Sequence, residues 1–203
     1  MTTHSLTGNL TSGSTSLKGE SSDIRPGWPE VVASLLTYLA LLLLIGFWLL
    51  SIPDDQAALR GIVGMATNGV AGSLALLSAY LLRLRSLPPF GFRGCPGKEM
   101  AAAAGLGVLA FGLSFGVEYV YFLFVTEPNN QADFQAAAQS GPLALAVLLF
   151  TGAVLTPLGE EVVFRGVVAN ALNRHGWWAG VVGSALIFAA VHGPSVIFLM
   201  LFW

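Results

Sequence analysis

Two adjacent glutamates stand in one of the most apolar parts of this chain. Glu160 and Glu161 are followed by Arg165, with almost no other charge nearby. A charged side chain at the centre of a bilayer costs at least ~2.5 kcal/mol, so ionisable groups there are rare and usually functional. On a helix, Glu161 and Arg165 share a face, whereas Glu160 is turned by about 100° from Glu161. The spacing predicts that Glu161 and Arg165 neutralise each other and leave Glu160 free for chemistry, although a structural ion network of all three is an alternative.

A histidine supplies the second polar group of the apolar region. His192 closes the stretch that begins at Phe188, and these two residues, four apart, share a helix face. A lone histidine at a helix end is more often structural than catalytic. Together with Glu160, however, an imidazole inside a membrane bundle can hold and deprotonate one water molecule. We therefore take Glu160 and His192 as the candidate catalytic pair.

The composition indicates which elements must position this pair. Of 203 residues, 55% are hydrophobic and only 10% are charged, against about 25% charged in soluble proteins. So short a chain cannot bury that much apolar surface in water, so we expect an all-α, polytopic transmembrane helical bundle. The net charge of −2 and the lack of a basic patch give no support for nucleic-acid binding. The single cysteine, Cys95, excludes an internal disulfide and is expected to be inert.

Hydrophobic runs divide the chain into a tail and a membrane domain. Residues 1–29 are rich in Ser, Thr and Gly and predict a disordered cytoplasmic tail; they lack the apolar core of a signal peptide. Residues 30–203 are expected to form the transmembrane domain, with residues 140–203 carrying the core of the site. The expected spans are residues 31–50, 61–82, 100–125, a fourth opening near 141 and meeting Pro157, and 177–192. The apolar run 195–203 is about half the length of a span, so we expect five complete spans, an incomplete sixth, and a fragment of a longer protein.

Charges in the loops predict the orientation. Residues 83–99 carry three arginines and one lysine, whereas residues 126–140 carry no basic residue. By the positive-inside rule, the loop 83–99 and the amino terminus are cytoplasmic. We expect an integral protein of a bacterial inner (plasma) membrane, although no residue identifies the organism.

Residues 100–125 carry two further features. Gly112 and Gly116 form a G-x-x-x-G pair of the kind used in close helix contacts, but the ordinary composition of membrane helices accounts for it better. Glu118 lies next to Tyr119 near the end of this span, and we expect it to be an interfacial acid.

The order of the polar motifs resembles a known family. The pattern Glu160-Glu161-x-x-x-Arg165, followed by Phe188-x-x-x-His192, resembles the CAAX-prenyl endopeptidase and bacteriocin-processing (CPBP, or Abi) family of intramembrane proteases. The resemblance is dense over residues 141–193 and only general before them. Two motifs in this order and at this spacing are a fairly specific signal, whereas either one alone would be weak.

The resemblance implies an endopeptidase that works within the membrane. Glu160 would activate the attacking water, His192 would help to position it, and Glu161 and Arg165 would hold the helix geometry, with Phe188 supporting. The family is generally interpreted as working without a metal, so we expect no cofactor and no metal. The implied partners are membrane lipid and a peptide or lipidated-protein substrate, while the sequence leaves the oligomeric state open.

One family motif is missing from these 203 residues. The family's third motif, a histidine followed four residues later by asparagine, is thought to stabilise the oxyanion, and no such pair occurs here. Each lost oxyanion donor typically costs about 10²- to 10³-fold in rate. We therefore expect the 203-residue form to be inactive or nearly so.

Other functions stay open on the sequence alone. The same scaffold could serve as a non-catalytic membrane protein with an immunity or partner-binding role. Glu160, Glu161 and His192 could also form the relay of a proton-coupled transporter, although no inverted repeat is visible. No H-E-x-x-H pattern points to a zinc hydrolase.

Overall fold

The computed structural model describes residues 25–124 and 131–192, and every regular element in these ranges is helical. The predicted all-α membrane bundle is confirmed, because four of the helices are long and apolar enough to cross a membrane. Residues 1–24 of the predicted tail and the apolar run 195–203, predicted as an incomplete sixth span, lie outside the described residues.

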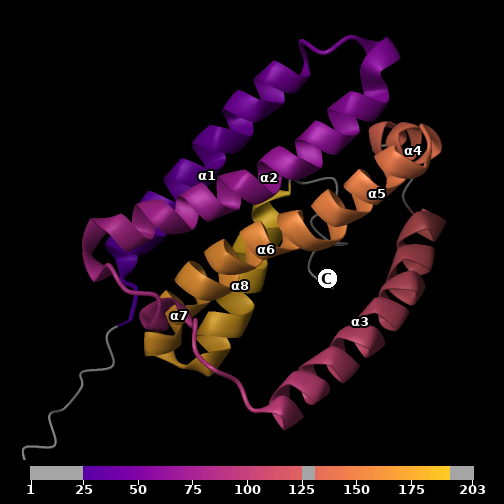
Figure 1. Ribbon diagram of the computed structural model, residues 1–203. Coiled ribbons are helices and arrows are strands. Elements are labelled where there is room, and N and C mark those ends of the chain that lie inside the picture. Colours follow the sequence, from indigo (N-terminus) through magenta and orange to yellow (C-terminus); the bar gives the residue numbers. More distant parts are fainter. Residues whose placement is uncertain (1–24, 125–130, 193–203) are drawn as a thin grey trace, which may run out of the picture.

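Within the described ranges, α-helices α1 to α8 follow one another along the chain (Figure 1). Their bounds are α1 Trp28–Leu49, α2 Ala57–Ala79, α3 Gly97–Phe124, α4 Ala132–Gln139, α5 Pro142–Phe150, α6 Thr156–Glu161, α7 Asn170–Leu172 and α8 Trp177–Val191. Short π-helical segments extend α2 over Tyr80–Leu84 and join α5, α6 and α7 over Thr151–Leu155 and Val162–Ala169. Residues 142–175 therefore form one continuous helical run that carries the acidic pair.

In the part of the chain that the structure describes, the helices long enough to span are Trp28–Leu49, Asp54–Leu84, Gly97–Phe124 and Pro142–His175. They match the first three predicted spans, and the fourth opens at Pro142 as predicted but continues through Pro157 to His175. The fifth predicted span, residues 177–192, is only partly confirmed. Its helix, α8, has 15 described residues and is about 22 Å long, which is shorter than the hydrocarbon core of about 30 Å. This helix starts only at Trp177 because Gly176, with φ of 112°, breaks the preceding run in a conformation that favours glycine.

A proline explains why the run 142–175 is irregular. Pro157 has no backbone N–H, so it cannot donate to the carbonyl of Ala153, and its ring crowds that group. The preceding turn widens instead, and the N–H of Thr156 bonds to the carbonyl of Thr151, five residues back. Such π-helical turns are rare and occur often at functional sites. The acidic pair lies shortly after this one and directly before the next.

The core lies where α1, α2 and α8 meet the segment 162–172. Helix α2 packs along α1 and crosses α6, while α8 packs against Val162–Ala169 (Figure 1). Most of the buried apolar residues form two clusters: Val31, Ala79, Phe90, Val167, Val168 and Ala171, and Tyr38, Ala71, Ala75, Val163 and Phe164. Helix α3 stands apart in Figure 1 and makes at most isolated contacts with other described elements.

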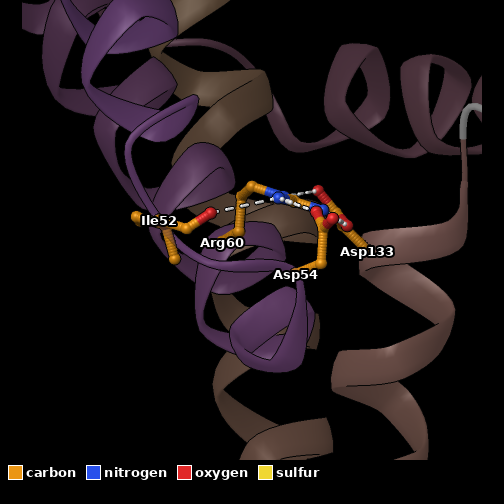
Figure 2. A network of polar contacts seen from close by, with 4 residues as sticks. All are labelled: Ile52, Asp54, Arg60 and Asp133. Carbon is orange, nitrogen blue, oxygen red and sulfur yellow. Dashed lines mark hydrogen bonds and ion pairs between the residues drawn. The ribbon is translucent and has the colours of Figure 1, made fainter.

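Ion pairs fasten the bundle at both ends. At one end, the fully buried carboxylate of Glu30 accepts two hydrogen bonds from Arg83 (2.9 and 3.0 Å) and one from the N–H of Gly27 (2.6 Å). These contacts join the start of α1 to the end of α2. At the opposite end, Arg60 of α2 pairs with Asp133 of α4 (Figure 2).

Candidate functional site

Three glycines bring α2 and α6 together at the acidic pair. A Cβ on Gly159 would stand 2.5 Å from the carbonyl oxygen of Gly69, and a Cβ on Gly72 would collide with the backbone of Gly159. Only glycine allows two helix backbones to approach so closely. Asn68 precedes Gly69 and Glu160 follows Gly159, so this crossing places their side chains within reach of each other.

A chain of two hydrogen bonds reaches Glu160 from α1 and α2. The hydroxyl of Tyr38 donates to Oδ1 of Asn68 at 2.7 Å, and Nδ2 of Asn68 donates to Oε1 of Glu160 at 2.9 Å. Tyr38 is 1% exposed, and the Glu160 side chain is 17% exposed. The carboxylate is thus held by a neutral donor inside the bundle.

His192 faces the same carboxylate oxygen from the end of α8. Its Nε2 lies 4.0 Å from Oε1 of Glu160, and its side chain is 25% exposed. Its Nδ1 lies 2.8 Å from the carbonyl oxygen of Phe188. Because a carbonyl only accepts, Nδ1 carries the proton of this bond, and Nε2 of the neutral ring is an acceptor directed towards Glu160.

Aromatic rings close the other side of the pair. The ring centroids of Tyr38 and Phe164 are 5.8 Å apart, those of Phe164 and Phe188 are 5.0 Å apart, and both pairs are edge-to-face. Phe188 then contacts His192, with centroids 4.5 Å apart. A closed ring of contacts results, which runs through Tyr38, Asn68, Glu160, His192, Phe188 and Phe164. One arc of the ring is polar and the other aromatic, which limits access to the carboxylate.

Glu161 and Arg165 lie on a more open side of the same helical run. The distance from Arg165 Nε to Glu161 Oε1 is 3.8 Å, and the side chains of Arg165 and Glu161 are 46% and 57% exposed respectively. Both line a pocket of about 310 Å³ together with Phe90 and Phe92. The Arg165 guanidinium also lies 6.0 Å from the centroid of the Phe188 ring.

The five residues singled out from the sequence thus fall into two sets. Glu160, His192 and Phe188 come together in the interior, whereas Glu161 and Arg165 pair beside them and face the pocket. Within the described ranges, no three His, Cys, Asp or Glu side chains come close enough to share a metal ion.

The sequence reasoning missed Tyr38 and Asn68. Each is a polar residue in the middle of a predicted span, where tyrosine and asparagine are uncommon. Asn68 is the only Asn, Gln, Asp or Glu between residues 61 and 82, and this was the signal that could have found it. What the sequence did not supply was its partner, 92 residues away.

Helix α3 gives a different result for the glycine pair noted in the sequence. A Cβ on Gly112 or Gly116 would meet nothing within 4 Å. Among the described residues, the close helix contact is made by Gly69, Gly72 and Gly159 instead.

Comparison with known proteins gives a match in the last third of the chain. No curated protein and no solved structure matches the chain. The family model described as type II CAAX prenyl endopeptidase Rce1-like matches residues 142–203, which contain Glu160, His192 and their supporting residues. The resemblance predicted from the two motifs is therefore confirmed, and this part of the chain is CAAX-protease-like.

Proposed function

We propose that this protein is a membrane-embedded endopeptidase in which Glu160 activates the attacking water and His192 orients it. The observation that carries the proposal is the 4.0 Å separation of Glu160 Oε1 and His192 Nε2, two groups that are both largely buried. The match of residues 142–203 to a CAAX endopeptidase family supports the same chemistry.

The geometry suits a water held between two acceptors. A water oxygen about 2.8 Å from both Oε1 and Nε2 would subtend about 90° between them, close to the angle between its own two O–H bonds. It could donate one hydrogen to each group and direct a lone pair at a peptide carbonyl. The bond from Nδ1 to the Phe188 carbonyl keeps the His192 ring in the required tautomer.

The proposed reaction has two steps. In the first, the water oxygen bonds to the carbonyl carbon while Glu160 takes one of its protons. In the second, the carbon–nitrogen bond breaks and Glu160 returns that proton to the leaving amine. Glu161 and Arg165 support the helix on its open side. The family resemblance assigns oxyanion stabilisation to a His-x-x-x-Asn pair, a pattern that these 203 residues do not contain.

The proposed substrate is a membrane-associated peptide or a lipidated protein, cleaved in a bacterial inner membrane. The proposed orientation has the amino terminus in the cytoplasm. Its support is that Arg83 meets the start of α1 and that Arg174 lies 5.9 Å from the ring of Trp28, so basic side chains gather at that end.

The test is peptide cleavage in vesicles that contain the product of the complete gene. A peptide with a farnesylated cysteine near its carboxyl terminus and the same peptide without the lipid are incubated, and fragments are identified by mass spectrometry. We expect Glu160→Gln and His192→Gln to lower the rate about 10²- to 10⁴-fold, the range of general-base catalysis. Glu118→Gln, which alters an exposed carboxylate on α3, is the matched control and should keep the wild-type rate.

Two outcomes would contradict the proposal. The first is cleavage that survives Glu160→Gln unchanged. The second is the absence of cleavage combined with proton flux into peptide-free vesicles that Glu160→Gln abolishes, which would favour the transporter alternative.

A further inference from the structure

We propose that Tyr38 and Asn68 are positioning residues, which hold the Glu160 carboxylate in one orientation opposite His192 through a hydrogen-bond chain of fixed direction. This inference rests on the proposed function, because it concerns the same carboxylate. It adds two residues from α1 and α2, outside the part of the chain that matches the family.

The direction of the chain follows from its first bond. The oxygen of the Asn68 amide can only accept, so the Tyr38 hydroxyl is the donor in the 2.7 Å contact. With its oxygen used in this way, the amide must turn its NH₂ group towards Glu160, where it donates at 2.9 Å. Without the hydroxyl, the amide could turn over and place its oxygen against the carboxylate, which repels it.

The second bond fixes the carboxylate. Oε1 of Glu160 receives the Asn68 donor and is also the atom 4.0 Å from His192 Nε2. Anchoring this oxygen stops the carboxylate from rotating about its last side-chain bond. Positioning of reacting groups to within a fraction of an ångström is a main source of catalytic rate, so losing the anchor should lower kcat.

Tyr38 also holds the Asn68 amide in place. Its hydroxyl lies in the interior of the bundle, about 15 Å along α1 from Trp28, and its ring packs edge-to-face on Phe164, which is fully buried. Phe164 belongs to the same helical run as Glu160. One side chain of α1 therefore contacts the Glu160 helix directly through its ring and indirectly through Asn68.

The decisive variant is Asn68→Asp, which keeps the size of the side chain but replaces the donor by an acceptor. We expect kcat to fall about 10- to 100-fold with KM changed by less than about twofold, because the proposed role of this group is to hold Glu160 and not to contact the substrate. Tyr38→Phe should lower kcat less, since the amide can still adopt the active orientation part of the time. Thr67→Val is the control, because the Thr67 hydroxyl bonds only to carbonyls of its own helix among the described contacts.

A second measurement tests the contact without using activity. The full chain is purified in detergent, and the midpoint of thermal unfolding is compared for Asn68→Asp, Glu160→Gln and the double variant. Asn68→Asp places two acidic groups together and should lower the midpoint. In the double variant the amide introduced at position 160 can donate to the aspartate, so the midpoint should return towards that of wild type.

The outcomes are separable. A double variant whose effects are simply additive overturns the contact, and with it the positioning role. A lower midpoint for Asn68→Asp with an unchanged kcat means a structural role only and also overturns the inference. Full activity in Asn68→Asp together with loss of activity in Glu160→Gln refutes the inference alone, whereas wild-type activity in Glu160→Gln refutes the proposed function.

Discussion

Two polar networks contact α2, eight residues apart, and they differ in how their charges are matched. Around Arg60, the guanidinium donates to both carboxylate oxygens of Asp133 (2.6 and 2.8 Å), to Asp54 (3.1 Å) and to the carbonyl of Ile52 (3.3 Å), as Figure 2 shows. Around Asn68, the Glu160 carboxylate accepts a hydrogen bond from the neutral Asn68 amide, and Nε2 of His192 lies 4.0 Å from the same carboxylate oxygen.

The difference separates a structural ion-pair network from the proposed functional site. The Arg60 network matches a cation with acids and ties the segment before α5 to the start of α2. The Glu160 network puts a carboxylate and an imidazole acceptor face to face, and no Lys or Arg of the described residues pairs with that carboxylate. Polar groups that are largely buried but not matched by charge are typical of reactive sites rather than of structural ion pairs.

The largest effect should come from closing the space at the helix crossing. In Gly72→Ala, the new methyl group meets the backbone of Gly159, so α2 and α6 must separate at the level of Asn68 and Glu160. We expect a loss of about 1–3 kcal/mol in stability, measured by unfolding, and loss of peptide cleavage. An unchanged unfolding midpoint would show that the helices do not approach this closely.

A smaller effect should come from Asp133→Asn, which weakens the Arg60 ion pair and leaves the contacts of Glu160 unchanged. Removing the charge opposite Arg60 should lower the melting temperature by a few degrees while kcat for peptide cleavage stays at the wild-type value. A proportional loss of activity in the correctly folded fraction would mean that the two networks are coupled.

The stability difference between wild type and Asp133→Asn should also depend on pH. Hydrogen bonds from Arg60 hold the pKa of Asp133 below its ordinary value, with burial opposing them. A lowered folded-state pKa gives stability that is fully present above the unfolded value of about 3.9 and is lost as the pH falls through the folded value. The difference in melting temperature between wild type and Asp133→Asn should therefore be constant from pH 7 to about pH 5 and shrink below about pH 4.

The smallest effect should come from Gly112→Ala on α3. Nothing lies within 4 Å of the new methyl group, and alanine is intrinsically about 1 kcal/mol more favourable than glycine inside a helix. Unfolding and cleavage should match wild type or show slightly higher stability. A loss comparable to that of Gly72→Ala would indicate that α3 has a close partner at this position.

Much of the fold could be predicted from the sequence, because hydrophobic runs of span length are local signals. Glu160 and His192 could be singled out for the same reason, since ionisable groups stand out in apolar segments. Asn68 and Tyr38 could not, because their meaning depends on partners from other helices. The close-contact glycines of α2 were missed because composition alone does not distinguish them from those of α3; only the crossing of α2 and α6 does.

The π-helical turn before Pro157 has a consequence for the two neighbouring acids. Such a turn accommodates one additional residue, so everything after it is rotated by about 100° relative to a regular helix. That rotation equals the angle between successive side chains. The two glutamates have identical side chains. Which of them points into the interior is therefore determined by the rotation of the helix, which the π-helical turn several residues upstream sets.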